Sequence, residues 1–570
     1  MKIKAYHGVI LLLIFIMGLY INTVTLNFQC DPFIPTTIIM AKSIGEFGSI
    51  TEACDYISNA AKYSAWQDHT KDFIKYEPLS GIIVCIIAKM TGLNEYTVSY
   101  LPIPYIIYCI FLYLIFKILY SINTKISRNQ NLNIFIFFVV LSGIYAFICK
   151  FVIGKFYVME YHGIYWVYIL AIYYLLLKYF ILNNNHEIIQ KIFLLIYIIF
   201  ITNLFTHYNF PMTILGGLII FITACMLLKC IGLNLLNNKI DYLKHAIPIF
   251  IILITLQNFY FLNLSHAGNF LDIFDILINT VINKITGSSS GVISSYSGYV
   301  YTTQWMFFRK WWHILFVLSA ISIFITITLY YLKNKDKNVN LMSYFYTLIL
   351  GRDFTWMYTY FINYGGNLSF YLPNSWFLNS LILTPITELL NSKKIFWKNT
   401  GKLFLIGAFI LTLFLILDSS FEAYYAISGY SPFPYQVRND GEQSFNFLIS
   451  NIDRPEIIVG SLESSSALYA EMSKYSISKL NIIYPKPALD YMLIPGVKEH
   501  KSINEIYYSL KKGRVSKFIL TKYELDKGFV GGLTVAPLTK NETKELKTIL
   551  DTNENLIYDS GKAKIYDFNY

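Results

Sequence analysis

The sequence predicts a polytopic α-helical membrane protein with about 11 transmembrane helices and a C-terminal α/β domain outside the membrane, and three observations lead to this class. Of the 570 residues, 55% are apolar, 18% are aromatic and only 14% are charged, whereas a soluble chain carries roughly 25% charged residues. Long apolar runs recur over the first 420 residues, and short β-branched runs replace them after residue 421. The apolar content excludes a disordered chain, and seven Cys exclude a disulfide-framed secreted domain.

Eleven segments are apolar over a length close to the about 20 residues that cross a bilayer. The first segment follows Lys2 and Lys4 and lacks a clean small-residue cleavage site, so it is predicted to remain as a signal anchor. The predicted spans are residues 7–27, 99–121, 133–153, 157–181, 192–206, 211–231, 246–263, 314–333, 341–363, 366–389 and 402–420.

Basic residues orient these spans, because loops on the cytoplasmic side carry more Lys and Arg. The formal net charge of +11 is explained in this way rather than by nucleic-acid binding, since no long basic run appears. The basic positions on one side of the count are Lys2 and Lys4, Lys125 and Arg128, Lys178 and Lys191, Lys239 and Lys244, Lys333 to Lys337, and Lys393 to Lys402. We expect the N-terminus on this cytoplasmic side and the C-terminus outside the cell membrane.

One apolar segment, residues 78–91, is predicted not to cross the membrane. It is short and contains Lys89, and a crossing here would move the basic loop at Lys125 and Arg128 to the outside. A run of about 10–14 apolar residues is more typical of an interfacial helix. We therefore expect this segment to lie in the outer interface.

The chain is thus predicted to contain a membrane domain over residues 1–420 and an extracytoplasmic α/β domain over residues 421–570. Two outer loops, residues 28–98 and 264–313, belong to the membrane domain, and the first contains the interfacial helices. Predicted elements of the second domain are strands at 456–460, 480–484, 517–520, 555–558 and 563–566 and helices at 503–512 and 541–551. Ser560-Gly561 predicts a hairpin turn between the last two strands.

Asp31 follows the first span within four residues of Asn27, at the outer membrane surface. An acid at this position can reach a lipid headgroup. Capping of a helix that begins near Pro35, or a solvated loop position, is the alternative interpretation.

The parts around Asp31 follow one another in a characteristic order. A signal anchor and an outer Asp precede the run Ile38-Ile39-Met40-Ala41-Lys42-Ser43-Ile44-Gly45-Glu46-Phe47-Gly48, and Tyr76-Glu77-Pro78-Leu79 then opens an interfacial helix that ends at Thr91-Gly92-Leu93. This order resembles the GT-C glycosyltransferases, integral-membrane enzymes that use polyprenyl-phosphate-linked sugars. The architecture covers most of the chain, and the motifs cover residues 25–120. The likeness is greatest to protein-mannosyltransferase-like and archaeal members with an outer C-terminal α/β domain.

The resemblance implies transfer of a sugar from a polyprenyl-phosphate donor to a protein, lipid or glycan acceptor, with Asp31 as the catalytic base. An acceptor group must lose its proton as it attacks the anomeric carbon, and the lipid phosphate leaves as an anion. One carboxylate is therefore sufficient, and the paired acids of glycoside hydrolases are not required.

Three further residues at outer helix ends are candidates for substrate binding. Glu160 and His162 begin the fourth span and are oxygen and nitrogen ligands suited to a divalent metal, Mg²⁺ or Mn²⁺. The chain has no DxD there, which leaves metal dependence open, and a solvated pair at a helix start is the alternative. His207 precedes the sixth span where archaeal relatives often carry a His, and a structural role is its alternative.

Two pairs of ionisable residues complete the candidates. Arg309 and Lys310 precede the eighth span on the outer side and are suited to hold the leaving lipid phosphate, whereas snorkelling to headgroups is the alternative. Arg352 and Asp353 fall inside the ninth span, where ionisable groups face a cavity or each other. A structural pair is the first interpretation, and substrate binding by Arg352 is the second.

Two other functions fit the same composition. A transporter or flippase of lipid-linked glycans would require ionisable residues along a path through the bilayer, whereas the acids here gather on one face. A non-catalytic membrane protein with a ligand-binding outer domain would be insensitive to changes at Asp31. Contact with membrane lipids is expected in every case.

Overall fold

The structure is a computed structural model, and it describes most but not all of the chain. The described residues are 5–26, 33–50, 52–53, 78–127, 129–150, 159, 161–181, 186–206, 209–235, 239–264, 303–334, 338–364, 375–427, 444, 446–448, 450–451, 456–460, 480–482, 502–512, 515–527 and 540–568.

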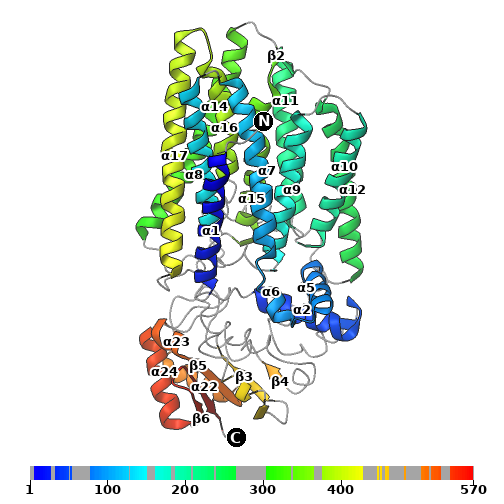
Figure 1. The fold of residues 1–570 in the computed structure, drawn as a ribbon. Coiled ribbons are helices and arrows are strands. Elements are labelled where there is room, and N and C mark those ends of the chain that lie inside the picture. Colours follow the sequence, from blue (N-terminus) through cyan, green and yellow to red (C-terminus); the bar gives the residue numbers. More distant parts are fainter. Residues whose placement is uncertain are drawn as a thin grey trace, which may run out of the picture.

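Every predicted span coincides with an α-helix, and Figure 1 shows these helices side by side in one bundle. They are α1 (Ala5–Leu26), α7 (Ile103–Ile126), α8 (Gln130–Lys150), α9 (Tyr161–Ile181), α10 (His186–Leu204), α11 (Asn209–Cys230), α12 (Lys239–Leu264), α14 (Thr303–Lys333), α15 (Tyr346–Tyr364), α16 (Ser375–Leu390) and α17 (Ile395–Ile427). Within the described residues, six helices are long and apolar enough to cross a membrane, namely α7, α9, α10, α11, α14 and α17. The count of eleven crossings therefore stays a prediction.

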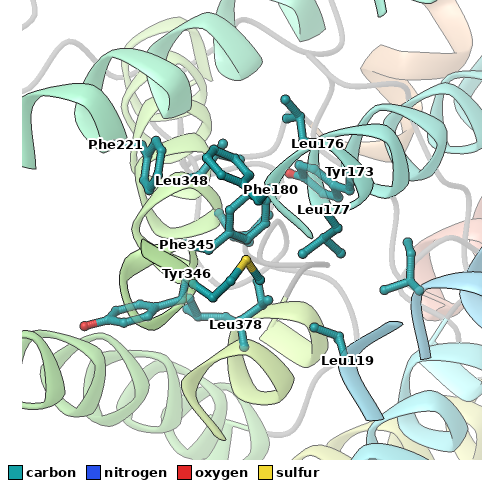
Figure 2. Close-up of a cluster of buried hydrophobic side chains, with 14 of the residues drawn as sticks. Leu119, Tyr173, Leu176, Leu177, Phe180, Phe221, Phe345, Tyr346, Leu348 and Leu378 are labelled. Carbon is teal, nitrogen blue, oxygen red and sulfur yellow. The ribbon is translucent and has the colours of Figure 1, made fainter. Parts of the chain in front are cut away.

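Aromatic and aliphatic side chains fill the interior of the bundle. Phe180 of α9 contacts Phe345 and Phe221 edge to face, with ring centroids 5.2 and 5.7 Å apart, and Figure 2 shows these rings together with Leu378 of α16. Such edge-to-face pairs add to the stabilisation from burial alone. Of the six long apolar helices, α9 is the most enclosed by the rest of the protein, so the predicted site residues at its start are attached to a rigid element.

Helices α11 and α15 approach each other closely because glycines face the contact. A Cβ atom at Gly217 would lie 2.6 Å from the backbone oxygen of Leu348, and a Cβ atom at Gly351 would lie 2.7 Å from the Cβ of Ile220. Any side chain at these positions would force the two backbones apart. The glycine contact thereby fixes the position of Arg352, the next residue of α15.

Three short helices lie at one end of the bundle, the end at which the C-terminal sheet also lies (Figure 1). They are α2 (Phe33–Phe47), α5 (Leu79–Thr91) and α6 (Glu95–Ser99). Helix α5 ends where Gly92 adopts a left-handed conformation with φ of 72°, as the Thr91-Gly92-Leu93 turn predicts. Its 13 residues extend about 20 Å, which is less than the roughly 30 Å of a hydrocarbon core.

The C-terminal part forms a five-stranded sheet in the order β4-β3-β5-β7-β6. The strands are β3 (Glu456–Val459), β4 (Leu480–Ile482), β5 (Lys517–Thr521), β6 (Asn555–Asp559) and β7 (Ala563–Asp567), and the helices are α22 (Ile503–Lys512), α23 (Lys522–Lys527) and α24 (Lys540–Asn553). Strand β3 pairs in parallel with β4 and β5, and β7 is antiparallel to β5 and β6. The five predicted strands, the hairpin turn and both predicted helices are confirmed, and α23 is additional.

A second, two-stranded sheet lies at the other end of the bundle and was not predicted from the sequence. Strand β1 (Asn234–Leu235) pairs in parallel with β2 (Asn338–Val339). It joins the segment after α11 to the segment after α14, and a 3-10 helix at Leu341–Tyr344 leads from it into α15.

Candidate functional site

Two backbone hydrogen bonds join three sequence-distant segments at the end of the bundle that carries α2, α5 and α6. The N–H of Leu79, at the start of α5, donates to the carbonyl of Phe205 (3.3 Å), just after α10. The N–H of Met159 donates to the carbonyl of Ser99 in α6 (2.9 Å). Buried backbone groups that pair in this way hold the segments in register. The short helices are thereby attached to the segments before α9 and after α10.

Helix α2 packs on α5 through small residues and one lysine. Gly81 of α5 faces Met40 of α2 so closely that a Cβ atom would lie 2.6 Å from the Met40 Cβ. Lys89 Nζ donates to the carbonyl oxygen of Gly45 (3.1 Å), in the last turn of α2. A cation is favourable at a helix C-terminus, where backbone carbonyls lack partners. Lys89, a charged residue in a segment that is predicted not to cross the membrane, thus fixes α5 to α2.

An apolar cluster completes this end of the bundle. Ala41 of α2, Val84 and Ala88 of α5, and Val98 of α6 are buried against Met159 and Ile164. Because Met159 belongs to this cluster, the start of α9 is fixed to the short helices by packing as well as by its hydrogen bond.

Several sequence-predicted site residues lie close in the chain to the segments that these contacts join, although the structure does not describe their side chains. Asp31, Glu160 and His207 lie outside the described residues. Pro32 separates Asp31 from α2, and this helix begins at Phe33, near Pro35 as the sequence predicts. Glu160 follows Met159 in the chain, and His207 follows Thr206 in the turn after α10.

For three other candidates the structure describes the backbone alone. His162 lies in the first turn of α9. Arg309 and Lys310 lie inside α14, which begins at Thr303, eleven residues before the predicted start of the eighth span at residue 314. The helix therefore begins before the apolar run, because nothing in the sequence from 303 to 313 breaks it. Both residues still precede the stretch from Leu315 to Lys333 that is long and apolar enough to cross a membrane.

Arg352 and Asp353 are fully described and form an ion pair inside the bundle. Arg352 Nη1 lies 3.1 Å from Asp353 Oδ1, and the two side chains are 1% and 2% exposed. The guanidinium carbon lies 5.3 Å from the ring centroid of Trp166 in α9, a cation–π distance. The residues contact each other, as the first interpretation of the sequence predicts, and protein encloses both.

Sequence reasoning missed two buried polar residues at the junction of α5 and α10. Ser80 and Asn203 are wholly buried, and neither the Ser80 hydroxyl nor the Asn203 amide forms a hydrogen bond with any residue that the structure describes. Ser80 follows Leu79, and Asn203 lies two residues before Phe205, so both belong to the backbone junction described above. The sequence signal that could have identified them is a single polar residue on the apolar face of α5 and of α10.

The described side chains include no cluster that could hold a metal ion. No group of three His, Cys, Asp or Glu residues lies together in this part of the structure. The side chains of Glu160 and His162 are not among those described.

Comparison with known proteins finds distant matches among solved structures. No protein-family model matches the chain, and no curated protein matches it in sequence. A crystal structure of the Archaeoglobus fulgidus oligosaccharyltransferase, tethered to an acceptor peptide with an NVT sequon, is 8% identical, with a TM-score of 0.46 over 92% of this chain and 70% of that chain. ArnT from Cupriavidus metallidurans aligns over 97% of both chains in the apo state (9% identity, TM-score 0.45) and with bound undecaprenyl phosphate (8%, 0.41).

Proposed function

We propose that the protein is a membrane glycosyltransferase that moves a sugar from a polyprenyl-phosphate donor to a protein, lipid or glycan acceptor. The reaction would take place at the end of the bundle that carries α2, α5 and α6. The observation that supports this proposal is the pair of backbone hydrogen bonds from Leu79 and Met159, which attach the segments next to His207 and Glu160 to the short helices that follow Asp31. The motif resemblance over residues 25–120 supplies the reaction type.

Asp31 would act as the general base. The acceptor hydroxyl or amide transfers its proton to the Asp31 carboxylate while its oxygen or nitrogen attacks the anomeric carbon. The bond from that carbon to the donor phosphate oxygen breaks, and its electron pair leaves with the phosphate. A positioned base accelerates such a step by roughly 10²–10⁴-fold.

Arg309 and Lys310 would hold the departing phosphate. Helix α14 contains 31 residues and extends about 46 Å, which exceeds the roughly 30 Å of a hydrocarbon core. Its N-terminal turns, which carry both residues, would therefore continue beyond the core into the interface. Paired hydrogen bonds from Arg and the charge of Lys favour the developing phosphate anion.

Glu160, His162 and His207 would line the donor or acceptor side of the same end. Glu160 and His162 also supply one oxygen and one nitrogen ligand for Mg²⁺ or Mn²⁺, and a bound metal would add positive charge beside the phosphate.

Transport of a lipid-linked glycan is less well supported. Within the described part of the helix bundle, the wholly buried charged side chains are Arg352 and Asp353, and they pair with each other. A translocation path would place ionisable groups at several depths, and the described residues contain no such series.

The test is transfer of labelled sugar from polyprenyl-phosphate donors by the purified full-length protein. We expect Asp31→Asn to lower turnover by roughly 10²-fold or more, and Glu46→Gln to leave it unchanged, because Glu46 is an exposed acid at the end of α2. Retained activity in Asp31→Asn would remove Asp31 as the base. Failure of the wild-type protein to turn over any such donor would overturn the proposed function.

A further inference from the structure

The first turns of α17 carry a ridge of exposed lysines that no function considered above uses. Lys394 immediately precedes the helix, and Lys398 and Lys402 follow at intervals of four residues, so all three lie along one ridge of the helix surface. Each is exposed, and none forms an ion pair with a residue that the structure describes. Figure 1 places this part of α17 at the end of the bundle opposite the C-terminal sheet.

The same ridge continues as an apolar surface. Ile406 and Ile410 occupy the next two positions at four-residue spacing and are 56% and 46% exposed. Leu403, Leu413 and Leu417 extend this exposed apolar face along the helix. One face of α17 is therefore cationic at the N-terminal end of the helix and aliphatic over the turns that follow. The helix itself is long and apolar enough to cross a membrane.

The lysine side chains point away from the aliphatic part of this face. In an α-helix the Cα–Cβ bonds tilt toward the N-terminus, so Lys398 and Lys402 lean toward the end where α17 begins. Long lysine side chains extend in this way to place the ammonium at the headgroup level while the methylene groups stay in the apolar layer. The lysine ridge spans about 12 Å along the helix, from Lys394 to Lys402, which is enough for more than one phosphate group.

Neighbouring contacts make this corner rigid. Asn391 Nδ2 donates to the carbonyl of Ile126 (2.7 Å), which ties the turn before α17 to the end of α7. Trp397 is buried, and the Lys333 ammonium lies 5.9 Å from its ring centroid. Beside it, Phe396 is 67% exposed. The lysines therefore belong to a helix end that is held in place by these contacts, and the exposed ring of Phe396 lies beside them.

We infer that this face of α17 binds an anionic glycerophospholipid of the leaflet at that end of the bundle. The lipid phosphate would lie along Lys394, Lys398 and Lys402, and an acyl chain would lie along Ile406 and Ile410. Juxtamembrane lysines are attracted to anionic headgroups, and each adds to the affinity. A lipid with two phosphates matches the length of the lysine ridge better than one with a single phosphate. This binding is independent of the proposed transfer reaction, which uses the other end of the bundle.

The test measures lipid binding to the full-length protein in neutral detergent by native mass spectrometry, with diphosphatidylglycerol, phosphatidylglycerol and phosphatidylcholine as probes. Wild-type protein is expected to bind the three in that order of decreasing affinity. The variant Lys394→Gln/Lys398→Gln/Lys402→Gln is expected to bind the two anionic lipids on the order of 100-fold more weakly at low ionic strength. All three substitutions are at exposed positions, so the fold is retained.

The control removes the same charge elsewhere. Lys522→Gln/Lys540→Gln/Lys544→Gln changes three exposed lysines of the C-terminal part, and it is expected to keep the wild-type order of affinities. Equal binding of phosphatidylcholine and the anionic lipids by the wild-type protein would overturn the inference. An unchanged preference in the α17 variant, or equal losses in both variants, would do so as well.

Discussion

Replacing Arg352 with Met tests whether the buried ion pair holds the bundle together or binds a ligand. The substitution removes the partner that lies 3.1 Å from Asp353 and the cation above the Trp166 ring, and it leaves the Asp353 carboxylate with a side chain only 2% exposed. Removing one member of a buried pair costs about 3–5 kcal/mol, because the remaining charge stays out of water and has lost its ion-pair partner. We expect Arg352→Met to lose stability by this amount in SDS-induced unfolding from mixed micelles.

The double variant Arg352→Met/Asp353→Asn distinguishes the cost of a buried charge at residue 353 from the loss of the Arg352 side chain itself. It keeps the shape of residue 353 but removes its buried charge, so it should recover at least half of the loss, since replacing a buried pair by neutral groups is often close to neutral. If the double variant is as unstable as Arg352→Met, the reasoning from charge is refuted. If Arg352→Met keeps its stability and loses donor turnover instead, Arg352 binds substrate and the structural interpretation is wrong.

Three other predictions concern packing, unpaired polar groups and pH. Gly217→Leu should prevent folding of the bundle, because its Cβ would lie 2.6 Å from a backbone oxygen of α15, whereas Gly407→Ala, where nothing lies within 4 Å, should be neutral; monodisperse elution of the purified proteins measures both. Asn203→Leu should leave stability unchanged or raise it, since an unpaired buried amide costs about 1–3 kcal/mol, and a loss of stability in thermal unfolding would show that the amide is paired in the folded protein. The backbone N–H of Gly561 lowers the pKa of Asp559, with burial opposing and Lys564 adding to the effect. A lowered folded-state pKa gives stability that is present above the unfolded pKa of about 3.9 and is lost as pH falls through the folded pKa. The free energy of opening of the β6–β7 hairpin, measured by hydrogen exchange and corrected for the intrinsic exchange rate at each pH, should therefore fall below about pH 4, and the change should be smaller in Asp559→Asn.

The sequence was sufficient to predict the long helices of the bundle and the five strands of the C-terminal sheet, because each depends on local hydrophobic periodicity. The run at 402–420 predicts a helix, although α17 begins seven residues earlier, at Ile395, since the exposed lysines before the run are good helix formers. Likewise, the C-terminal strands follow from short β-branched runs such as Lys517–Thr521. The polar start of α10 at His186 was missed because periodic apolar residues begin only later.

Contacts between distant segments could not be read from the sequence. Nothing local to Lys89 indicates that its ammonium reaches the carbonyl of Gly45, 44 residues earlier. The same holds for the approach of Gly217 to α15, which depends on the shape of a second helix. Arg352 and Asp353 were predictable as a pair because they are adjacent and burial of either alone is costly. The roles of Asp31, Arg309 and Lys310 remain predictions, since they depend on side-chain positions set by such distant contacts.

The lysine between α2 and α5 also has a consequence for biogenesis. In the predicted topology α5 does not cross the membrane, and its insertion during synthesis would reverse every helix that follows it. A lysine in a membrane-inserting segment opposes insertion, and Lys89 lies in the last turn of α5. The residue that closes the α2–α5 contact in the finished protein is therefore also the one that opposes a reversed topology during synthesis, before any tertiary contact exists to correct the error.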